Sequence, residues 1–242
     1  MSGALLDVAG LGKRFGGFVA LEAIDLAVAA GERVGLIGPN GSGKSTLVNC
    51  ISGTLRNETG QVRFAGKVMD GMAAHRRTRL GLARSFQLPR PFHSLTVTEN
   101  LLIPIEYVVH HRGKGRVDLI ARCAELLEMV GLAGRGDDLP AGLTQVEMRK
   151  LELARAMAAE PRLLIADEAM AGLSHQEVDD ILTLLVRLND QGVTIIMIEH
   201  IMRAVMQFSQ RLVVLVAGRK IADGVPEEVI RNPEVERAYL GE

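Results

Sequence analysis

The sequence predicts an α/β fold with a parallel sheet, an antiparallel β subdomain and an inserted helical lobe. Near-continuous apolar runs of strand length occur at Arg33–Ile37, Arg162–Glu168 and Val193–Ile198, and they alternate with helical patterns. Such runs are typical of strands that are buried on both faces of a parallel sheet with helices on both sides. In sheets of this kind, ligands gather at the carboxyl ends of the strands.

Shorter strand patterns near both ends of the chain predict the antiparallel part. Two of them flank Ala65-Gly66 and form a hairpin pattern, and two more flank a turn at Ala217-Gly218-Arg219. The strands expected here are Leu5–Val8, Ala23–Val28, Gln61–Phe64, Lys67–Met69, Leu212–Val216 and Lys220–Ala222.

The helical lobe is expected in the middle of the chain. A helical pattern runs from Thr98 to Val109, is interrupted around Gly113-Lys114-Gly115 and resumes at Val117. We therefore expect one domain over 1–242, with a core formed by 1–90 and 159–242 and a lobe over 91–158.

Composition limits the possible partners. A net charge of -1 supplies no field that attracts nucleic acid, and aromatic residues at 3% with no Trp leave few surfaces on which bases stack. We expect no nucleic-acid binding. No apolar run approaches the roughly 18 residues of a membrane span, so membrane contact is expected to go through a partner.

Three other features favour structural roles over binding sites. Cys50 and Cys123 lie in apolar helical patterns, which favours two reduced core thiols over a disulfide or a metal pair. His110-His111 resembles a metal pair, but adjacent residues point to different helix faces. The basic stretch Ala73–Arg79 favours a solvated helix face over an RNA contact, because it is short and lacks aromatic residues.

A glycine-rich loop lies between an apolar strand and a helix start. It fits the pattern G-x-x-x-x-G-K-[ST], whose backbone NH groups curl around phosphates at the positive end of a helix. Lys44 then reaches the β and γ phosphates, and the Ser45 hydroxyl ligates Mg²⁺. The alternative is a chance glycine-rich turn. The binding residues are Gly38, Pro39, Asn40, Gly41, Ser42, Gly43, Lys44, Ser45 and Thr46.

Polar residues at strand ends supply the groups that hydrolysis needs. Asp167 positions Mg²⁺, and Glu168 polarises the attacking water, a role worth roughly 10²- to 10⁴-fold. A plain acidic helix start is the alternative for this pair. The Gln87 amide can contact the γ phosphate, the water and the metal. His200 follows another buried strand, where a structural histidine is the alternative.

Phe15 is a candidate for base contact. Its ring lies beside Gly16-Gly17, and a π face accepts adenine without polar readout. An ordinary core aromatic is the alternative interpretation.

The order of these motifs resembles the ATP-binding subunits of ABC transporters, over essentially the whole chain. The resemblance implies an ABC-type P-loop NTPase fold, with ATP and Mg²⁺ as cofactors. It places Phe15 at the adenine-stacking position, Gln87 in the Q-loop, and Asp167 at the end of Walker B. It makes Glu168 the catalytic glutamate and His200 the switch histidine. Ala171-Gly172-Leu173-Ser174 then forms the D-loop.

Several short segments also resemble the LivG-type subunits of branched-chain amino acid importers. They are Phe15-Gly16-Gly17, Arg84–Gln87, Thr96–Leu101, Ala171–Leu173, Ile198-Glu199-His200 and Ala238–Gly241.

The chain departs from the family pattern at its signature motif. The motif falls at Leu143–Glu147, where most members have Leu-Ser-Gly-Gly-Gln, and in the family it caps the γ phosphate bound by the opposite subunit. Thr144 keeps the hydroxyl, and the resemblance makes Thr144 and Glu147 the nucleotide-binding residues of this motif. At Gln145 and Val146 a backbone path with φ > 0 would be costly, and Glu147 would oppose phosphate if it pointed that way. We therefore expect a heterodimer with one strong and one weak site, a homodimer being the alternative.

The resemblance implies the ATP-hydrolysing subunit of an importer for branched-chain or other hydrophobic amino acids or related amides. The implied partners are transmembrane permease subunits, a second ATP-binding subunit and, indirectly, a periplasmic or extracellular solute-binding protein. The implied location is peripheral, on the cytoplasmic face of the plasma (inner) membrane, with Gln87–Asn100 as docking surface. Alternatives are a soluble ABC-type nucleotide-gated interaction module and, last, a kinase-like enzyme.

Overall fold

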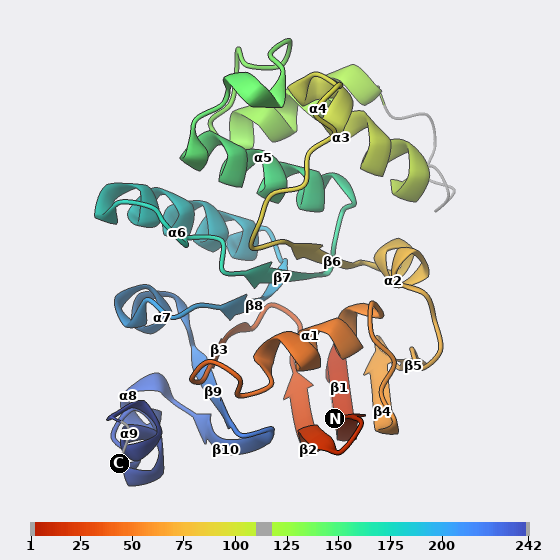
Figure 1. The fold of residues 1–242 in the computed structure, drawn as a ribbon. Coiled ribbons are helices and arrows are strands. Elements are labelled where there is room, and N and C mark those ends of the chain that lie inside the picture. The colour runs from red at the N-terminus through yellow and green to blue at the C-terminus, as the bar shows by residue number, and fades with distance from the viewer. Residues whose placement is uncertain (1–2, 110–117, 241–242) are drawn as a thin grey trace. The chain divides into compact units, whose positions relative to one another are not determined.

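The computed structural model of the chain describes residues 3–109 and 118–240 (Figure 1). Contacts divide these residues into two compact units. The first unit comprises residues 3–77 and 194–240, and the second comprises 78–109 and 118–193. The predicted lobe boundaries, 91–158, stay a prediction.

The first unit contains the predicted antiparallel sheet. Its strand order is β2-β1-β4-β5, and every pair along it is antiparallel. The tight turn between the last two strands uses Ala65 at φ 49° and Gly66 at φ 77°, which confirms the predicted hairpin. The strands are β1 (Leu6–Phe15), β2 (Phe18–Val28), β4 (Thr59–Phe64) and β5 (Lys67–Val68).

The first unit also contains parallel strands around β3 (Arg33–Ile37). This strand pairs in parallel with β8 (Thr194–Ile198) and with β9 (Arg211–Val216), and its apolar side chains are buried. β10 (Arg219–Gly224) runs antiparallel to β9, as the late hairpin pattern predicted. The carboxyl end of β3 leads into the glycine-rich loop.

The helices of the first unit begin with α1 (Lys44–Ser52), which ends at Gly53 with φ 81°. The sequence analysis missed α7 (Met202–Phe208). This helix has seven residues, which is too few to display a helical period in the sequence. Its buried side chains are Ala204, Val205 and Phe208. The remaining helices are α2 (Ala74–Leu80), whose last residues pass into the second unit, α8 (Pro226–Val229) and α9 (Pro233–Leu240).

The second unit contains two parallel strands and the three longest helices of the described residues. β6 (Leu82–Ser85) pairs with β7 (Leu163–Asp167), and the helix α3 packs against α4 and α5. A π-helical segment, η1, continues α3 beyond Pro104. The helical elements are α3 (Val97–Pro104), η1 (Ile105–Val109), α4 (Leu119–Met129), η3 (Pro140–Gly142), α5 (Gln145–Ala158) and α6 (His175–Asp190).

Three helices of the second unit begin with the same reciprocal cap. In each, a Ser or Thr side chain accepts from the backbone NH three residues on, and the Glu at that position accepts from the backbone NH of the cap. The pairs are Thr96 with Glu99, Thr144 with Glu147, and Ser174 with Glu177.

Cys50 and Cys123 are free and buried, as predicted, and desolvation by burial raises the pKa of each thiol to about 11. His110-His111 lies outside the described residues. Within 3–109 and 118–240, no helix has both the length and the apolarity that a bilayer crossing requires.

The expectation of a solvated basic face on α2 was wrong for Arg77, which is buried. Its guanidinium donates to the carbonyls of Cys50 and Ile51 at 2.8 and 2.7 Å, at the C-terminal end of α1. It also donates to Met69 and Met72. A cation that meets the last carbonyls of a helix stabilises its negative end. Arg77 therefore fixes the helix that follows the glycine-rich loop.

Replacing Arg77 with Met should lower the free energy of unfolding by about 3 kcal/mol, because buried carbonyls then lose their donors. Urea unfolding followed by circular dichroism measures this difference. Arg76→Met is the matched control, since its exposed side chain should leave stability within about 0.5 kcal/mol of the wild type. Equal losses in both variants would contradict the capping role.

Candidate functional site

The glycine-rich loop adopts a backbone that only glycine tolerates at two positions. Gly38 has φ 153°, and a Cβ there would lie 2.1 Å from the Leu215 carbonyl oxygen. Gly43 has φ 104°, and a Cβ there would lie 2.8 Å from the Ala20 oxygen. The glycine pattern is therefore required by close packing as well as by dihedral angle. The loop delivers Gly43 as the N-cap of α1, with no side chain to cover the helix end.

Lys44 folds back over its own loop. Its ammonium lies 2.6 Å from the Gly38 oxygen, 3.1 Å from the Pro39 oxygen and 3.5 Å from Ser42 Oγ. A positive charge is thus held where backbone NH groups and the start of α1 also favour an anion. The next residue, Ser45, is exposed in the first turn of α1. This arrangement can bind a chain of phosphates.

A residue that the sequence analysis did not assign, Tyr239 of α9, also reaches this loop. Partial burial raises the pKa of its hydroxyl, and a hydrogen bond with the backbone of Gly38 works against that rise. The C-terminal helix therefore contacts the first residue of the loop. The signal available in the sequence for this contact was an aromatic residue close to the end of the chain.

Phe15 and His200 are the other predicted site residues of the first unit. Phe15 ends β1 with half of its surface exposed, and the Lys13 ammonium lies 5.4 Å from its ring centroid, so it is not a core aromatic. His200 follows β8 with an exposed side chain, while its neighbour Glu199 is buried. Both rings are accessible, and base stacking and phosphate contact stay predictions.

In the second unit, the end of β7 presents Asp167 and Glu168. Asp167 is buried, and its Oδ2 lies 2.5 Å from Nη2 of Arg84 on β6. Glu168 has φ 47°, a left-handed conformation that is rare outside glycine and asparagine and is found at functional sites. This turn sends its carboxylate off the strand axis, where it accepts a hydrogen bond from Nε2 of Gln87. The structure thus brings Gln87 and Glu168 together.

The sequence analysis missed Arg84. A single cation within the otherwise small or apolar strand Leu82–Ser85 was the signal that was available. A buried carboxylate at the end of a strand needs a countercharge or hydrogen-bond donors, and Arg84 supplies both to Asp167.

The segment Leu143–Glu147 forms the capped start of α5. Thr144 Oγ1 accepts from the Glu147 backbone NH at 3.3 Å, and Glu147 Oε2 accepts from the Thr144 backbone NH at 2.8 Å. Gln145 and Val146 occupy the first helical turn without positive φ, so the anticipated backbone cost is absent. The helix begins at Gln145, so the backbone needs no positive φ at Gln145 or Val146, and the anticipated cost does not arise.

Glu147 does not project as a free negative charge. Besides its bond to Thr144, its Oε1 lies 3.1 Å from Nη1 of Arg135. The hydrogen bond from the Thr144 backbone, with a smaller contribution from the Arg135 charge, lowers the pKa of the Glu147 carboxyl. The anticipated repulsion of phosphate by this carboxylate is therefore offset locally.

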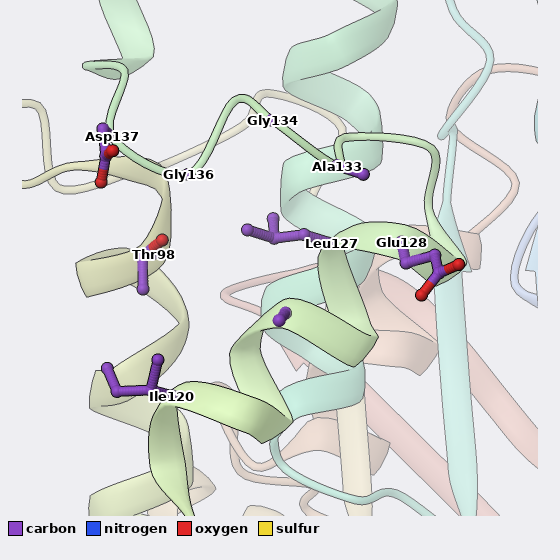
Figure 2. Close-up of a pocket in the computed structure, with 9 residues that line it drawn as sticks. Thr98, Ile120, Leu127, Glu128, Ala133, Gly134, Gly136 and Asp137 are labelled. Carbon is purple, nitrogen blue, oxygen red and sulfur yellow. The ribbon is translucent and has the colours of Figure 1, made fainter.

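A cavity of about 380 Å³ lies elsewhere in the second unit. Its lining combines apolar Ile120 and Leu127 with Thr98 and the carboxylates of Glu128 and Asp137 (Figure 2). None of the residues predicted to contact nucleotide or metal lines this cavity, so it is separate from the candidate site.

The glycine-rich loop, with Lys44 at an open helix start, defines the class of P-loop nucleotide-binding proteins. The family model described as ABC transporter matches residues 21–171, which is more than half of the chain. A second model, described as branched-chain amino acid ATP-binding cassette transporter, matches residues 219–242. The chain belongs to the ABC transporter family.

Similar proteins cover the full length of the chain. It is 37% identical over 259 residues to the high-affinity branched-chain amino acid transport ATP-binding protein BraF of Pseudomonas aeruginosa, with 100% of both chains covered. It is 36% identical over 258 residues to the corresponding protein LivG of Escherichia coli K12, again with 100% of both covered. The fold also covers 99% of this chain and 100% of a nucleotide-free ATP-binding cassette from an ABC transporter, with TM-score 0.88 and 30% identity. A cassette in its ADP conformation gives TM-score 0.87 at 31% identity, with 99% of each chain covered.

Replacing Glu147 with Gln should lower the free energy of unfolding by about 0.5 kcal/mol at pH 7, since the cap keeps a neutral acceptor but loses its charge. The folded-state pKa of Glu147 is lowered, so its contribution is present above the unfolded-state pKa of about 4.3 and is lost as the pH falls through the folded value. The urea midpoints of the wild type and of Glu147→Gln should therefore converge as the pH falls through this range. A difference independent of pH would contradict an ionised cap.

Proposed function

We propose that this chain is the ATP-hydrolysing subunit of an ABC importer for branched-chain or other hydrophobic amino acids or related amides. One observation carries the proposal. The glycine-rich loop holds Lys44 over an open helix start, in a chain similar over its whole length to branched-chain amino acid transport ATP-binding proteins. Phosphate binding at such a helix start follows from its free NH groups and its dipole.

The phosphates of ATP are assigned to the loop Gly38–Thr46 and to the ammonium of Lys44. The close packing of Gly38 against the Leu215 carbonyl restricts the conformation of the loop, which favours a small ordering cost on nucleotide binding. Phe15 offers its exposed face to the adenine ring.

Mg²⁺ is assigned to the Ser45 hydroxyl, the Asp167 carboxylate and the Gln87 amide oxygen. These side chains would hold the ion through oxygen ligands, the kind that Mg²⁺ prefers. A bound ion would supply positive charge that stabilises the phosphates during the reaction. Arg84 holds Asp167 in one orientation at 2.5 Å, so the carboxylate is positioned in advance.

Glu168 is assigned as the base that orients and polarises the attacking water, and His200 as a contact to the γ phosphate. The hydrogen bond from Gln87 occupies one carboxylate oxygen of Glu168. A Gln87 side chain that turned towards the metal or the γ phosphate would release that oxygen for water. Movement of the Q-loop would then decide when Glu168 can act.

Thr144 is assigned to the nucleotide of a second ATP-binding subunit, through its hydroxyl and the start of α5. Glu147 supports Thr144 through the reciprocal cap and is a positioning residue.

The permease subunits of the importer are the partners expected at Gln87–Asn100, and a solute-binding protein acts through them. The chain then works at the cytoplasmic face of the inner membrane. The soluble interaction module is not favoured, since full-length relatives are transport ATP-binding proteins.

Replacing Lys44 with Ala should abolish ATP-driven uptake and lower ATP hydrolysis at least about 10²-fold, because the phosphates lose their positive partner. Uptake of labelled leucine into vesicles that contain the assembled transporter measures the first effect, and phosphate release measures the second. Lys67→Ala, at an exposed lysine of β5, is the control and should behave as wild type. Normal uptake by Lys44→Ala would refute the role.

The pairing with a related but different ATPase can be tested through Glu168. Gln145 and Val146 stand where most family members have glycines, at the start of α5. Their side chains add bulk to the surface that is proposed to contact the nucleotide of the second subunit. Glu168→Gln in this chain and the equivalent change in the partner should therefore lower phosphate release by different factors. Equal losses of phosphate release would indicate two equivalent sites and contradict the proposed difference between them.

A further inference from the structure

One face of α5 carries three charged side chains that are withdrawn from water. Arg149 and Glu152 are 7% and 6% exposed, and Arg155 follows at the same spacing with a side chain that is 17% exposed. Residues three apart are neighbours on a helix surface. Since burying charge is costly unless partners are present, this face must meet specific groups.

Those groups belong to the main chain of the loop Phe86–Phe92. Arg149 donates to the Gln87 carbonyl. Arg155 Nη1 donates to the Arg90 carbonyl at 2.6 Å, and Glu152 Oε2 accepts from the Arg90 backbone NH at 3.4 Å. Arg155 and Glu152 also pair with each other at 3.0 Å. The two prolines of the loop have no NH to donate, so the loop depends on such outside partners.

The far end of the same loop is held by a second helix. The buried Asn100 of α3 accepts from the Phe92 backbone NH at 2.8 Å and donates to the Phe92 carbonyl at 3.1 Å. The Arg155 guanidinium lies 5.2 Å from the Phe92 ring centroid. The loop is therefore fixed between α5 and α3.

The same helix also reaches the D-loop. Arg149 Nη2 donates to the Ala171 carbonyl at 3.2 Å, and Gln145 Nε2 donates to the same oxygen at 3.4 Å. Arg149 thus bonds two loops at once with different nitrogens of one planar group, a geometry that a lysine cannot reproduce.

We propose that the face Arg149–Glu152–Arg155 of α5 couples the loop Phe86–Phe92 to the capped start of the helix at Thr144. A displacement of the loop by a docked permease subunit then moves Thr144 with it. The three side chains are positioning residues, because they hold main-chain groups of the loop. This inference rests on the proposed function. It adds the contacts through which docking of a permease subunit would move Thr144 and the start of α5, which face the nucleotide of the second subunit.

Arg155→Met tests the coupling in the assembled transporter, because it removes the hydrogen bond to the Arg90 carbonyl and leaves Arg149 in place. Phosphate release by the isolated chain should stay within about twofold of wild type, while leucine uptake per ATP should fall about tenfold, the factor expected from one lost charge-assisted hydrogen bond. Arg122→Met is the matched control, since it deletes an Arg–Glu pair of the same spacing on α4. Wild-type uptake per ATP in Arg155→Met overturns the proposal.

Hydrogen exchange of the isolated chain provides a readout that does not need transport. In Arg155→Met and in Glu152→Gln, amides of Phe86–Phe92 should exchange about tenfold faster, while those within α5 keep wild-type protection. Unchanged loop exchange overturns the proposal, as does equal acceleration throughout α5, which indicates plain unfolding. If the wild-type transporter takes up no leucine, isoleucine or valine, the proposed function fails, and loop exchange alone decides the inference.

Discussion

The close approach of Gly38 to the Leu215 carbonyl is the constraint on which the nucleotide site depends. With 2.1 Å between that oxygen and the place of a missing Cβ, the loop rests on β9 without an intervening side chain. The loop can then deliver Gly43 to the start of α1 and keep Lys44 within reach of its own carbonyls. Arg77 secures the other end of α1, so both ends of this short helix are fixed by groups from elsewhere in the first unit.

Each acidic group of the second unit that the sequence singled out has a polar partner. Asp167 pairs with Arg84 and Glu147 with Arg135, while Glu168 accepts a hydrogen bond from the neutral amide of Gln87. Each partner fixes the direction of a carboxylate, which is what preorganisation requires. The unusual sequence of the signature segment is thus compatible with an ordinary capped helix.

Local patterns sufficed for most of the architecture, but not for groups whose partners are distant in sequence. The apolar strands, the turn at Ala65-Gly66 and the glycine-rich loop each follow from neighbouring residues, and the structure has them in the expected places. The burial of Arg77 does not, because its carbonyl partners lie up to 27 positions earlier in the chain. The contacts of Arg84 with Asp167 and of Arg149 with Gln87 span more than 60 positions and were equally hidden. Helix α7 was missed for the opposite reason, since seven residues display too little of a period.

The loop Phe86–Phe92 is gripped through its peptide groups, and this separates its attachment from its surface. Leu88 is 72% exposed and Phe92 is 44% exposed, yet α5 and α3 hold the carbonyls and NH groups beneath them. A substitution at Leu88 changes the outer face of the loop and leaves every anchoring bond intact. The outer side chains of the loop can therefore change without loss of its main-chain attachment to α5 and α3.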